Sequence, residues 1–165
     1  MKFIPRYLRT ENYLFYSQKS VVDLKSDLQA LFDNKWYDIS VNLSGDFVTD
    51  NEFHVTKKIS FVVSKNGSSG STKLKCKIYT DNQKTIIDIA VKPNSQLYVW
   101  TIIPPMFALV MLYSIISHPT NNLPVAIFVI AFTFFIIPVA ARFYGQAAKT
   151  ELKNIFVDTF KLTKV

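Results

Sequence analysis

Cysteine, glycine and histidine are scarce in this chain of 165 residues, which has one cysteine, four glycines and two histidines. The single cysteine, Cys76, excludes a disulfide within the chain. The glycines form neither a phosphate-binding loop nor a dinucleotide-binding turn, and the chain has no HExxH sequence and no cysteine pair for a metal. His54 and His118 are isolated in the sequence, as solvated histidines usually are. We therefore expect no cofactor, no metal site, no catalytic residue and no enzymatic activity.

Charged residues are missing from one long block, residues 97–141. The chain before this block has 14 basic and 10 acidic side chains and the chain after it has 5 and 2, so net charges of +4 and +3 flank it. Two apolar runs fill the block, 97–117 and 123–141, and about 20 residues are needed to cross a bilayer core. Neither run has the polar stripe of a helix in a soluble protein. We expect a transmembrane hairpin of two helices.

Basic residues near the ends of the runs indicate the orientation of this hairpin. Lys92 precedes the first run, whereas Arg142, Lys149 and Lys153 follow the second, and the connecting turn at 118–122 has no basic residue. Cytoplasmic segments carry the excess of lysine and arginine. We therefore expect a multi-pass protein of the cell inner membrane with both termini in the cytoplasm and the turn outside.

Prolines interrupt both apolar runs, at Pro104, Pro105 and Pro138. Each proline removes a backbone donor and can kink a helix. We expect the hydroxyls of Thr101 and Thr133 to satisfy the carbonyl groups that the prolines leave free. The kinks are either hinges of a gate or static bends in an anchor, and the lack of an ionisable group in the runs favours the anchor.

Residues 1–95 are expected to form a cytoplasmic α+β domain. The aromatic stretch 13–16 predicts a short strand and is too short for a signal sequence, so we expect Met1 to stay in the mature protein. Ser20 can cap a helix with Asp23 three residues later. The helix is expected to end near Asp33, with Asn34 as a left-handed stop. Its apolar positions recur at helical spacing: Val21, Leu24, Leu28, Leu31 and Phe32.

Apolar residues alternate with polar ones from residue 41 to residue 91, which predicts four consecutive antiparallel strands. Turns are expected at 50–51 and 81–83 and a flexible hairpin loop at 65–71. The alternating apolar positions are Val41, Leu43, Phe53, Val55, Ile59, Phe61, Val63, Leu74, Cys76, Ile78, Ile87, Ile89 and Val91. The predicted fold is a helix packed on an antiparallel sheet of four to five strands, followed by the hairpin and a C-terminal amphipathic helix.

The tail at 142–165 has an apolar side formed by Leu152, Ile155, Phe156, Thr159 and Phe160, with Lys149, Lys153, Asp158 and Lys161 elsewhere. This pattern suits a helix on the inner membrane surface. It suits docking against the predicted sheet equally well, and the sequence leaves both alternatives open.

Lysines alternate along the strand that contains Cys76 and form a basic ladder. Such a ladder can contact anionic lipid headgroups. The alternative is that these lysines only solvate an exposed sheet face and protect it from aggregation. No nucleic-acid-binding motif accompanies the charge, so we expect no nucleic acid partner. The candidate contacts with anionic lipid are Lys73, Lys75, Lys77, Arg142, Lys149 and Lys153.

Four short motifs follow one another along the chain: LSGDF at 43–47, NEFHV at 51–55, TIIDI at 85–89 and KPN at 92–94, just before the first apolar run. This order resembles a group of small, uncharacterised bacterial membrane proteins, in which an N-terminal helix and sheet precede two spans. The resemblance covers most of the chain. It implies a bacterial inner-membrane location and supplies no catalytic residue.

These observations lead to two hypotheses about function. The first is a non-enzymatic, membrane-anchored binding or signalling module, whose partners are the bilayer and either another protein or a second copy bound through the hairpin. The second is a membrane-disrupting or pore-forming effector that its soluble domain controls. An enzyme that acts on lipid would require a pocket lined by convergent polar groups.

Overall fold

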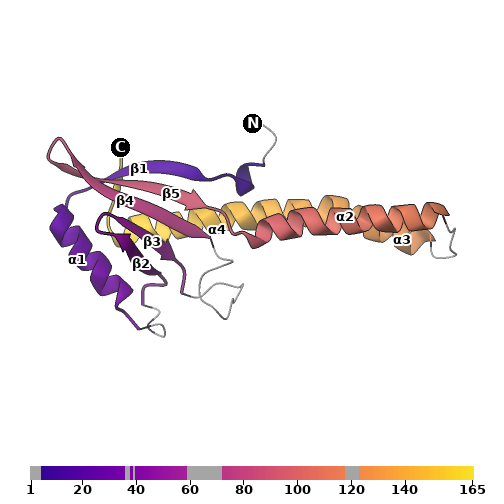
Figure 1. Ribbon diagram of the computed structural model, residues 1–165, viewed down its shortest axis with the longest axis horizontal. Helices are drawn as coiled ribbons and strands as arrows, with labels where there is room; N and C mark the ends of the chain where they lie inside the picture. Colours follow the sequence, from indigo (N-terminus) through magenta and orange to yellow (C-terminus); the bar gives the residue numbers. More distant parts are fainter. Residues whose placement is uncertain (1–4, 36–37, 39, 59–71, 118–122) are drawn as a thin grey trace.

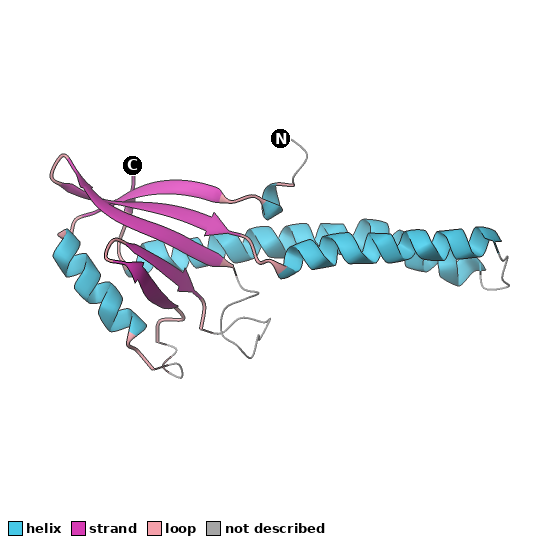
Figure 2. Ribbon diagram, viewed as in Figure 1, coloured by secondary structure: helices cyan, strands magenta, loops and turns pink. Residues whose placement is uncertain are grey.

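The computed structural model describes residues 5–35, 38, 40–58, 72–117 and 123–165. A sheet with helices against it lies at one end, and two long helices project from it (Figure 1, Figure 2). The expected α+β class is confirmed. In chain order the elements are η1 (Arg6–Leu8), β1 (Glu11–Ser17), α1 (Val21–Phe32), β2 (Ser44–Thr49), β3 (Glu52–Thr56), β4 (Lys73–Asp81), β5 (Lys84–Lys92), α2 (Gln96–Ser117), α3 (Leu123–Ala131), the π-helical segment η2 (Phe132–Ile136), α4 (Ile137–Thr159) and β6 (Thr163–Lys164).

The sheet of the described chain has six strands in the order β2-β3-β4-β5-β1-β6, and all neighbouring pairs are antiparallel. The expected meander is present in β2 to β5. The predicted number of four to five strands was too low, because the short β6 pairs with β1 on the side opposite β5. Residues 59–63, expected to extend β3, and the expected loop at 65–71 lie outside the described residues.

Local sequence signals account for α1. The Ser20 hydroxyl accepts a hydrogen bond from the Asp23 backbone N–H at 3.2 Å, so the predicted N-cap is confirmed. The helix ends at Phe32. The expected left-handed stop at Asn34 was wrong, since the described non-glycine residues with positive φ are Asn82, Gln83 and Lys161.

The predicted alternation in β4 and β5 is confirmed. Leu74, Cys76 and Ile78 are buried, while the lysines between them point to the other side of the sheet. The expected turn joins the two strands, with φ of 47° at Asn82 and 64° at Gln83. Two central residues with positive φ make a type I′ turn, which matches the twist of an antiparallel hairpin.

Both α1 and the second half of α4 cover the same face of the sheet, and the opposite face is open (Figure 1). Leu152 and Phe156 of α4 are fully buried against the sheet together with Phe53 of β3. The two alternatives for the tail are thus decided, because the tail docks on the sheet. Its apolar side joins the core of the sheet domain, where burial removes it from water.

The tail is also not a separate helix. Helical structure continues from Leu123 through η2 to Thr159, so the helix does not begin near residue 142 as expected. It ends earlier than expected, since Lys161 adopts a φ of 49°. The Leu162 N–H donates to Val157 O at 2.9 Å and the Lys161 N–H to Asp158 O, which is a Schellman motif. This motif turns the chain back into β6.

Helix α2 lies beside the helix formed by α3, η2 and the first half of α4 (Figure 1). Both helices are long and apolar enough to cross a membrane. The expected turn at 118–122 lies outside the described residues. Large apolar side chains cover the outer surface of this pair, for example Phe107, which is 67% exposed.

Thr101 and Thr133 do not act as expected. The Thr101 hydroxyl donates to Leu97 O at 2.6 Å, and the Thr133 hydroxyl donates to Val129 O at 2.7 Å. The carbonyl groups freed by prolines lie four residues before each proline, and these hydroxyls bond to other carbonyls. The prediction was wrong because a threonine hydroxyl on a helix reaches the carbonyl four residues before its own position most easily.

Pro138 lies two residues after the end of the π-helical segment η2, in the first turn of α4. The Ile137 N–H donates to the carbonyl of Phe132, five residues earlier, which widens the helix by one residue at this turn. A π-helical turn accommodates the missing proline donor within a continuous helix. The helix therefore reaches the sheet without a break.

Candidate functional site

The candidate site lies where the long helices meet the sheet. Residues Tyr7 and Leu8 of η1 pack against Leu97 of α2 and Ala141 of α4, and all four are buried. Gly145 of α4 allows this close approach, because a Cβ atom at this position would lie 2.7 Å from Leu97 Cδ1. The segment before β1 therefore packs against both long helices through Tyr7 and Leu8.

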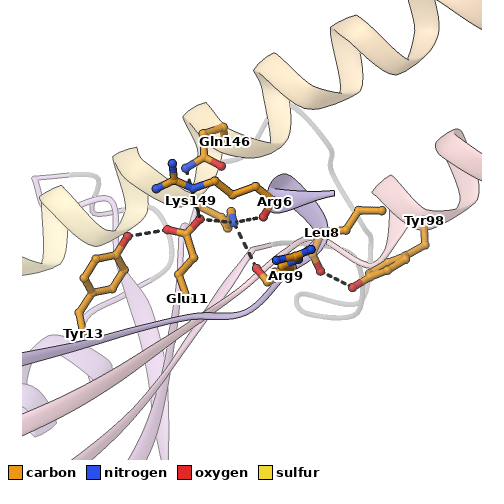
Figure 3. A network of polar contacts seen from close by, with 8 residues as sticks. All are labelled: Arg6, Leu8, Arg9, Glu11, Tyr13, Tyr98, Gln146 and Lys149. Carbon is orange, nitrogen blue, oxygen red and sulfur yellow. Dashed lines mark hydrogen bonds and ion pairs between the residues drawn. The ribbon is translucent and has the colours of Figure 1, made fainter. Parts of the chain in front are cut away.

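A buried lysine is the centre of this junction. Lys149 of α4 is only 2% exposed, and its ammonium group donates to Arg6 O at 3.0 Å, Arg9 O at 3.2 Å and the Glu11 carboxylate at 2.9 Å (Figure 3). An ammonium group has three protons, so all of its donors have acceptors. The lysine therefore holds the start of β1 against α4.

Glu11 is surrounded by donors. Its carboxylate accepts hydrogen bonds from the Tyr13 hydroxyl, from Lys149 and, at 3.4 Å, from the Gln146 amide, and Arg6 Nε lies 3.6 Å from it (Figure 3). Burial raises the pKa of Glu11, but the bonds from Tyr13 and Lys149 outweigh it and lower the pKa to about 2. We name these five residues the junction network.

The pKa of Tyr13 changes in the opposite direction from that of Glu11. Its hydrogen bond to the Glu11 carboxylate, together with burial, raises the pKa of the Tyr13 hydroxyl. The hydroxyl therefore stays protonated and continues to donate at neutral pH. The hydrogen bond between Tyr13 and Glu11 thus keeps the hydroxyl protonated and the carboxylate ionised at neutral pH.

The first turn of α2 is attached to the same region. The Tyr98 hydroxyl donates to Leu8 O at 2.6 Å, which ties α2 to the segment before β1 (Figure 3). The buried Asn94 accepts the Gln96 backbone N–H at 2.8 Å and caps the helix. Both long helices are thus fixed to the N-terminal segment by specific bonds.

A cavity of about 480 Å³ opens beside the junction network, and we name it the junction cavity. Pro138 and Val139 form its apolar part. They precede Arg142 by about one turn of α4, on the side of the apolar run. Arg142 is exposed at its edge. Among the described residues, the lining consists of Pro5, Arg6, Tyr7, Pro138, Val139, Arg142 and Gln146.

The lysines of the predicted basic ladder lie on the open face of the sheet. Lys77 pairs with Glu52 at 3.2 Å. Lys73 lies opposite Lys92 in the register, close to where β5 leads into α2. The neighbouring Lys75 ammonium group lowers the pKa of Lys92, and Lys73, Lys75 and Lys92 bring three like charges together at this end of the sheet.

The three remaining candidate lipid contacts have different surroundings. Arg142 is exposed beside the junction cavity. Lys153 lies over the Tyr13 ring, with its Nζ 4.8 Å from the ring centre. Lys149 requires a correction, because an ammonium group that is buried and bonded to three protein acceptors has no proton for a lipid headgroup in this conformation.

Sequence reasoning missed the partners of Lys149. A signal for its burial exists, since Gly145, Lys149, Leu152 and Phe156 follow at spacings of four, three and four, which is one face of a helix. A lysine in an apolar stripe predicts a buried acceptor. No pattern along the chain shows that this acceptor is Glu11, 138 residues away.

The other residues examined for chemistry are not assembled into a catalytic group. Cys76 is buried, and burial and the charge of Asp88 raise the pKa of its thiol, which makes it inert. His54 of β3 lies on the open face, opposite Asp46 of the edge strand β2. Within the described ranges no three His, Cys, Asp or Glu side chains are grouped so as to hold a metal ion.

Comparison with known proteins finds no matching family model, no matching curated protein and no matching solved structure.

Proposed function

We propose that this chain is an integral inner-membrane protein that acts as a non-enzymatic binding or signalling module. Helix α2 and the helix from α3 to the first half of α4 form its two spans, and the sheet domain lies in the cytoplasm with both termini. The observation that carries the proposal is the continuity of the helix from Leu123 to Thr159, whose first part is apolar and exposed and whose end lies in the core of the sheet domain.

The exposed apolar surface supports the membrane part of the proposal. Phe128 and Phe135 are each about 70% exposed on the second helix, as Phe107 is on α2. Soluble monomers rarely expose contiguous apolar patches of more than a few hundred Å². A bilayer removes this cost, because lipid tails solvate apolar side chains on all sides of a helix pair.

The rigid junction supports the signalling part. A shift or rotation of the second span moves α4 as one body, and α4 carries Leu152 and Phe156 in the core of the sheet. The junction network resists slippage between α4 and β1, since separating the partners of a buried ion pair costs about 3–5 kcal/mol. Movement in the membrane is thus transmitted to the sheet domain.

The open face of the sheet supports the binding part. Its lysines near the spans, Lys73, Lys75 and Lys92, repel one another and attract anions. A strand rises about 3.3 Å per residue, so these lysines lie within about 20 Å of the start of α2. The open face therefore suits an acidic surface on a partner protein or an anionic membrane.

Cysteine accessibility in intact cells tests the topology. In a Cys76→Ser background, a single cysteine at Asn121 is expected to react with an impermeant maleimide, whereas a single cysteine at Gln83 reacts only after permeabilisation. Reaction at Gln83 alone would reverse the orientation. Release of the protein from membranes by carbonate washing would contradict the two spans altogether.

The membrane-disrupting effector remains the second candidate, because prolines lie in both members of the helix pair and a π-helical segment lies in the second. Such irregular turns are frequent at functional positions. Dye leakage from vesicles that depends on Pro104, Pro105 and Pro138 would favour the effector. Intact vesicles containing the reconstituted protein are the result that our proposal predicts.

A further inference from the structure

The junction cavity combines an apolar floor with two cationic groups. Pro138 and Val139 form the floor, and Arg142 lies one turn of α4 further toward the sheet. Arg6 reaches the same cavity from η1, and its side chain is 81% exposed. The two arginines thus belong to segments more than 130 residues apart in the chain and line one cavity only in the folded protein.

The charge near this cavity is positive. The junction network contains Arg6, Lys149 and one carboxylate, Glu11, and Arg142 is added beside it, so three cations face one anion. Lys149 is directly bonded to Glu11 and neutralises it. The net charge of two is therefore available to an anion from outside. The position of Arg142 also influences buried Tyr7, whose pKa burial raises and Arg142 lowers.

The order of chemistry along α4 matches the order of groups in a phospholipid. Val139 suits an acyl chain, Arg142 suits a phosphate, and Gln146, about 6 Å further along the helix, suits polar headgroup atoms. Guanidinium groups bind phosphate oxygens in pairs, which makes arginine the preferred residue for such a site.

We propose that the junction cavity binds the phosphate group of an anionic phospholipid, held between Arg6 and Arg142. This inference rests on the proposed membrane location and makes it specific. It also adds Arg6, which the charge pattern of the sequence did not identify, and it excludes Lys149, whose protons are used within the protein. A lipid bound there bridges η1 and α4 and so reinforces the junction.

Native mass spectrometry of the full chain in neutral detergent tests this site. Phosphatidylglycerol and phosphatidylcholine with identical acyl chains are titrated separately. We expect the phosphatidylglycerol complex to be at least about tenfold tighter for the unmodified protein. Arg6→Gln and Arg142→Gln are each expected to weaken it about fivefold, as suits one basic residue at a headgroup. Lys84→Gln, which removes one charge at the far hairpin, should leave binding unchanged.

Several results would overturn the site. Equal binding of both lipids would remove the phosphate specificity, and an equal loss in Arg9→Gln would indicate diffuse attraction to positive charge. Displacement of the lipid by excess inorganic phosphate would assign the cavity to free phosphate. Arg6→Lys and Arg142→Lys keep the charge and guard against misfolding, and they are expected to bind with intermediate affinity.

Failure of this site is distinguishable from failure of the proposed function. A protein without spans is released by carbonate washing, and its cysteine at Asn121 reacts only after permeabilisation. A protein with spans but without the site keeps the expected labelling pattern and has no preference for phosphatidylglycerol.

Discussion

Two halves of α4 have opposite surroundings although they form one helix. In the first half Phe143 is 72% exposed and lies on an apolar outer surface, whereas in the second half Phe156 is fully buried against the sheet. The exposed positions of the second half are polar, as at Glu151 and Asp158. The exposed side chains of the helix therefore change from apolar to polar within about one turn, between Gly145 and Lys149. The junction network lies at this turn.

The largest effect is expected from truncating the helix on its buried side. Phe156→Ala removes a ring packed on Phe53 and Phe160 and should lower the free energy of unfolding by about 3–5 kcal/mol. Phe143→Ala is the matched control on the exposed side and should change it by less than about 1 kcal/mol. Unfolding of both variants in detergent is measured by circular dichroism. Similar losses in both would contradict the comparison.

The second largest effect is expected at the Glu11–Lys149 ion pair, where the two halves of α4 meet. Glu11→Gln leaves the Lys149 ammonium group buried without its anion and should cost about 3 kcal/mol. Glu52→Gln makes the same change at the exposed pair with Lys77 and should cost less than about 1 kcal/mol. Replacing Lys149 by Met in the Glu11→Gln background should restore most of the loss, because no unpaired charge is then buried. A double variant as unstable as Glu11→Gln would contradict this account.

The pH dependence follows from the same pair. The pKa of Glu11 is about 2 in the folded chain, against an ordinary value of 4.5. Because this pKa is lower in the folded chain, the unfolded chain takes up the proton first as the pH falls. The contribution of ionised Glu11 to the free energy of unfolding is therefore complete above about pH 5 and is lost as the pH falls toward 2. The stability difference between the unmodified chain and Glu11→Gln should therefore shrink by up to about 3 kcal/mol over this range. A difference that does not change with pH would contradict the lowered pKa.

A smaller effect is expected where α2 and α4 touch. Gly145→Ala places a methyl group 2.7 Å from Leu97 Cδ1, and the strain of about 1–3 kcal/mol is partly offset by the higher helix propensity of alanine. We expect the free energy of unfolding to fall by about 1 kcal/mol in total. Leu97→Ala in the same chain removes the collision, so the double variant should lose less than the sum of the two single losses. Simple additivity would show that the two side chains do not collide.

The smallest effect tests a part of the sheet far from the junction. Gln83 has a φ of 64° in the β4 to β5 turn, which glycine adopts without strain. Gln83→Gly produces an Asn-Gly turn and should stabilise the domain by about 0.5 kcal/mol. Gln83→Ala should not stabilise it. A gain with alanine would show that backbone strain is not the cause.

Periodicity in the sequence predicted most single elements correctly. Ser20 and Asp23 marked the start of α1, and the alternation of Leu74, Cys76 and Ile78 marked β4, because capping and side-chain direction are local properties. The stop at Asn34 failed, since a residue type only favours a left-handed conformation and the following chain decides it. The added strand β6 failed for a related reason, as two residues have too little pattern to be recognised.

The candidate site was less predictable than the elements. Lys149 was predicted to be a lipid contact because it follows the second apolar run, and the predicted apolar side of the tail, which includes Leu152 and Phe156, did not contain it. The hydroxyls of Thr101 and Thr133 were assigned to the wrong carbonyls because helix geometry limits their reach. Both errors concern which acceptor a side chain bonds to in the folded protein.

The sequence by itself determined the secondary-structure class, the two apolar runs and the positive charge on both sides of them, because hydrophobic periods and composition are properties of contiguous residues. Only the tertiary structure decided that the second run continues into the core of the sheet domain, that Lys149 meets Glu11, and that Arg6 and Arg142 share one cavity. The physical reason is that a buried charge, unlike an apolar side chain, needs a specific partner at a specific distance, and chain folding alone brings such partners together.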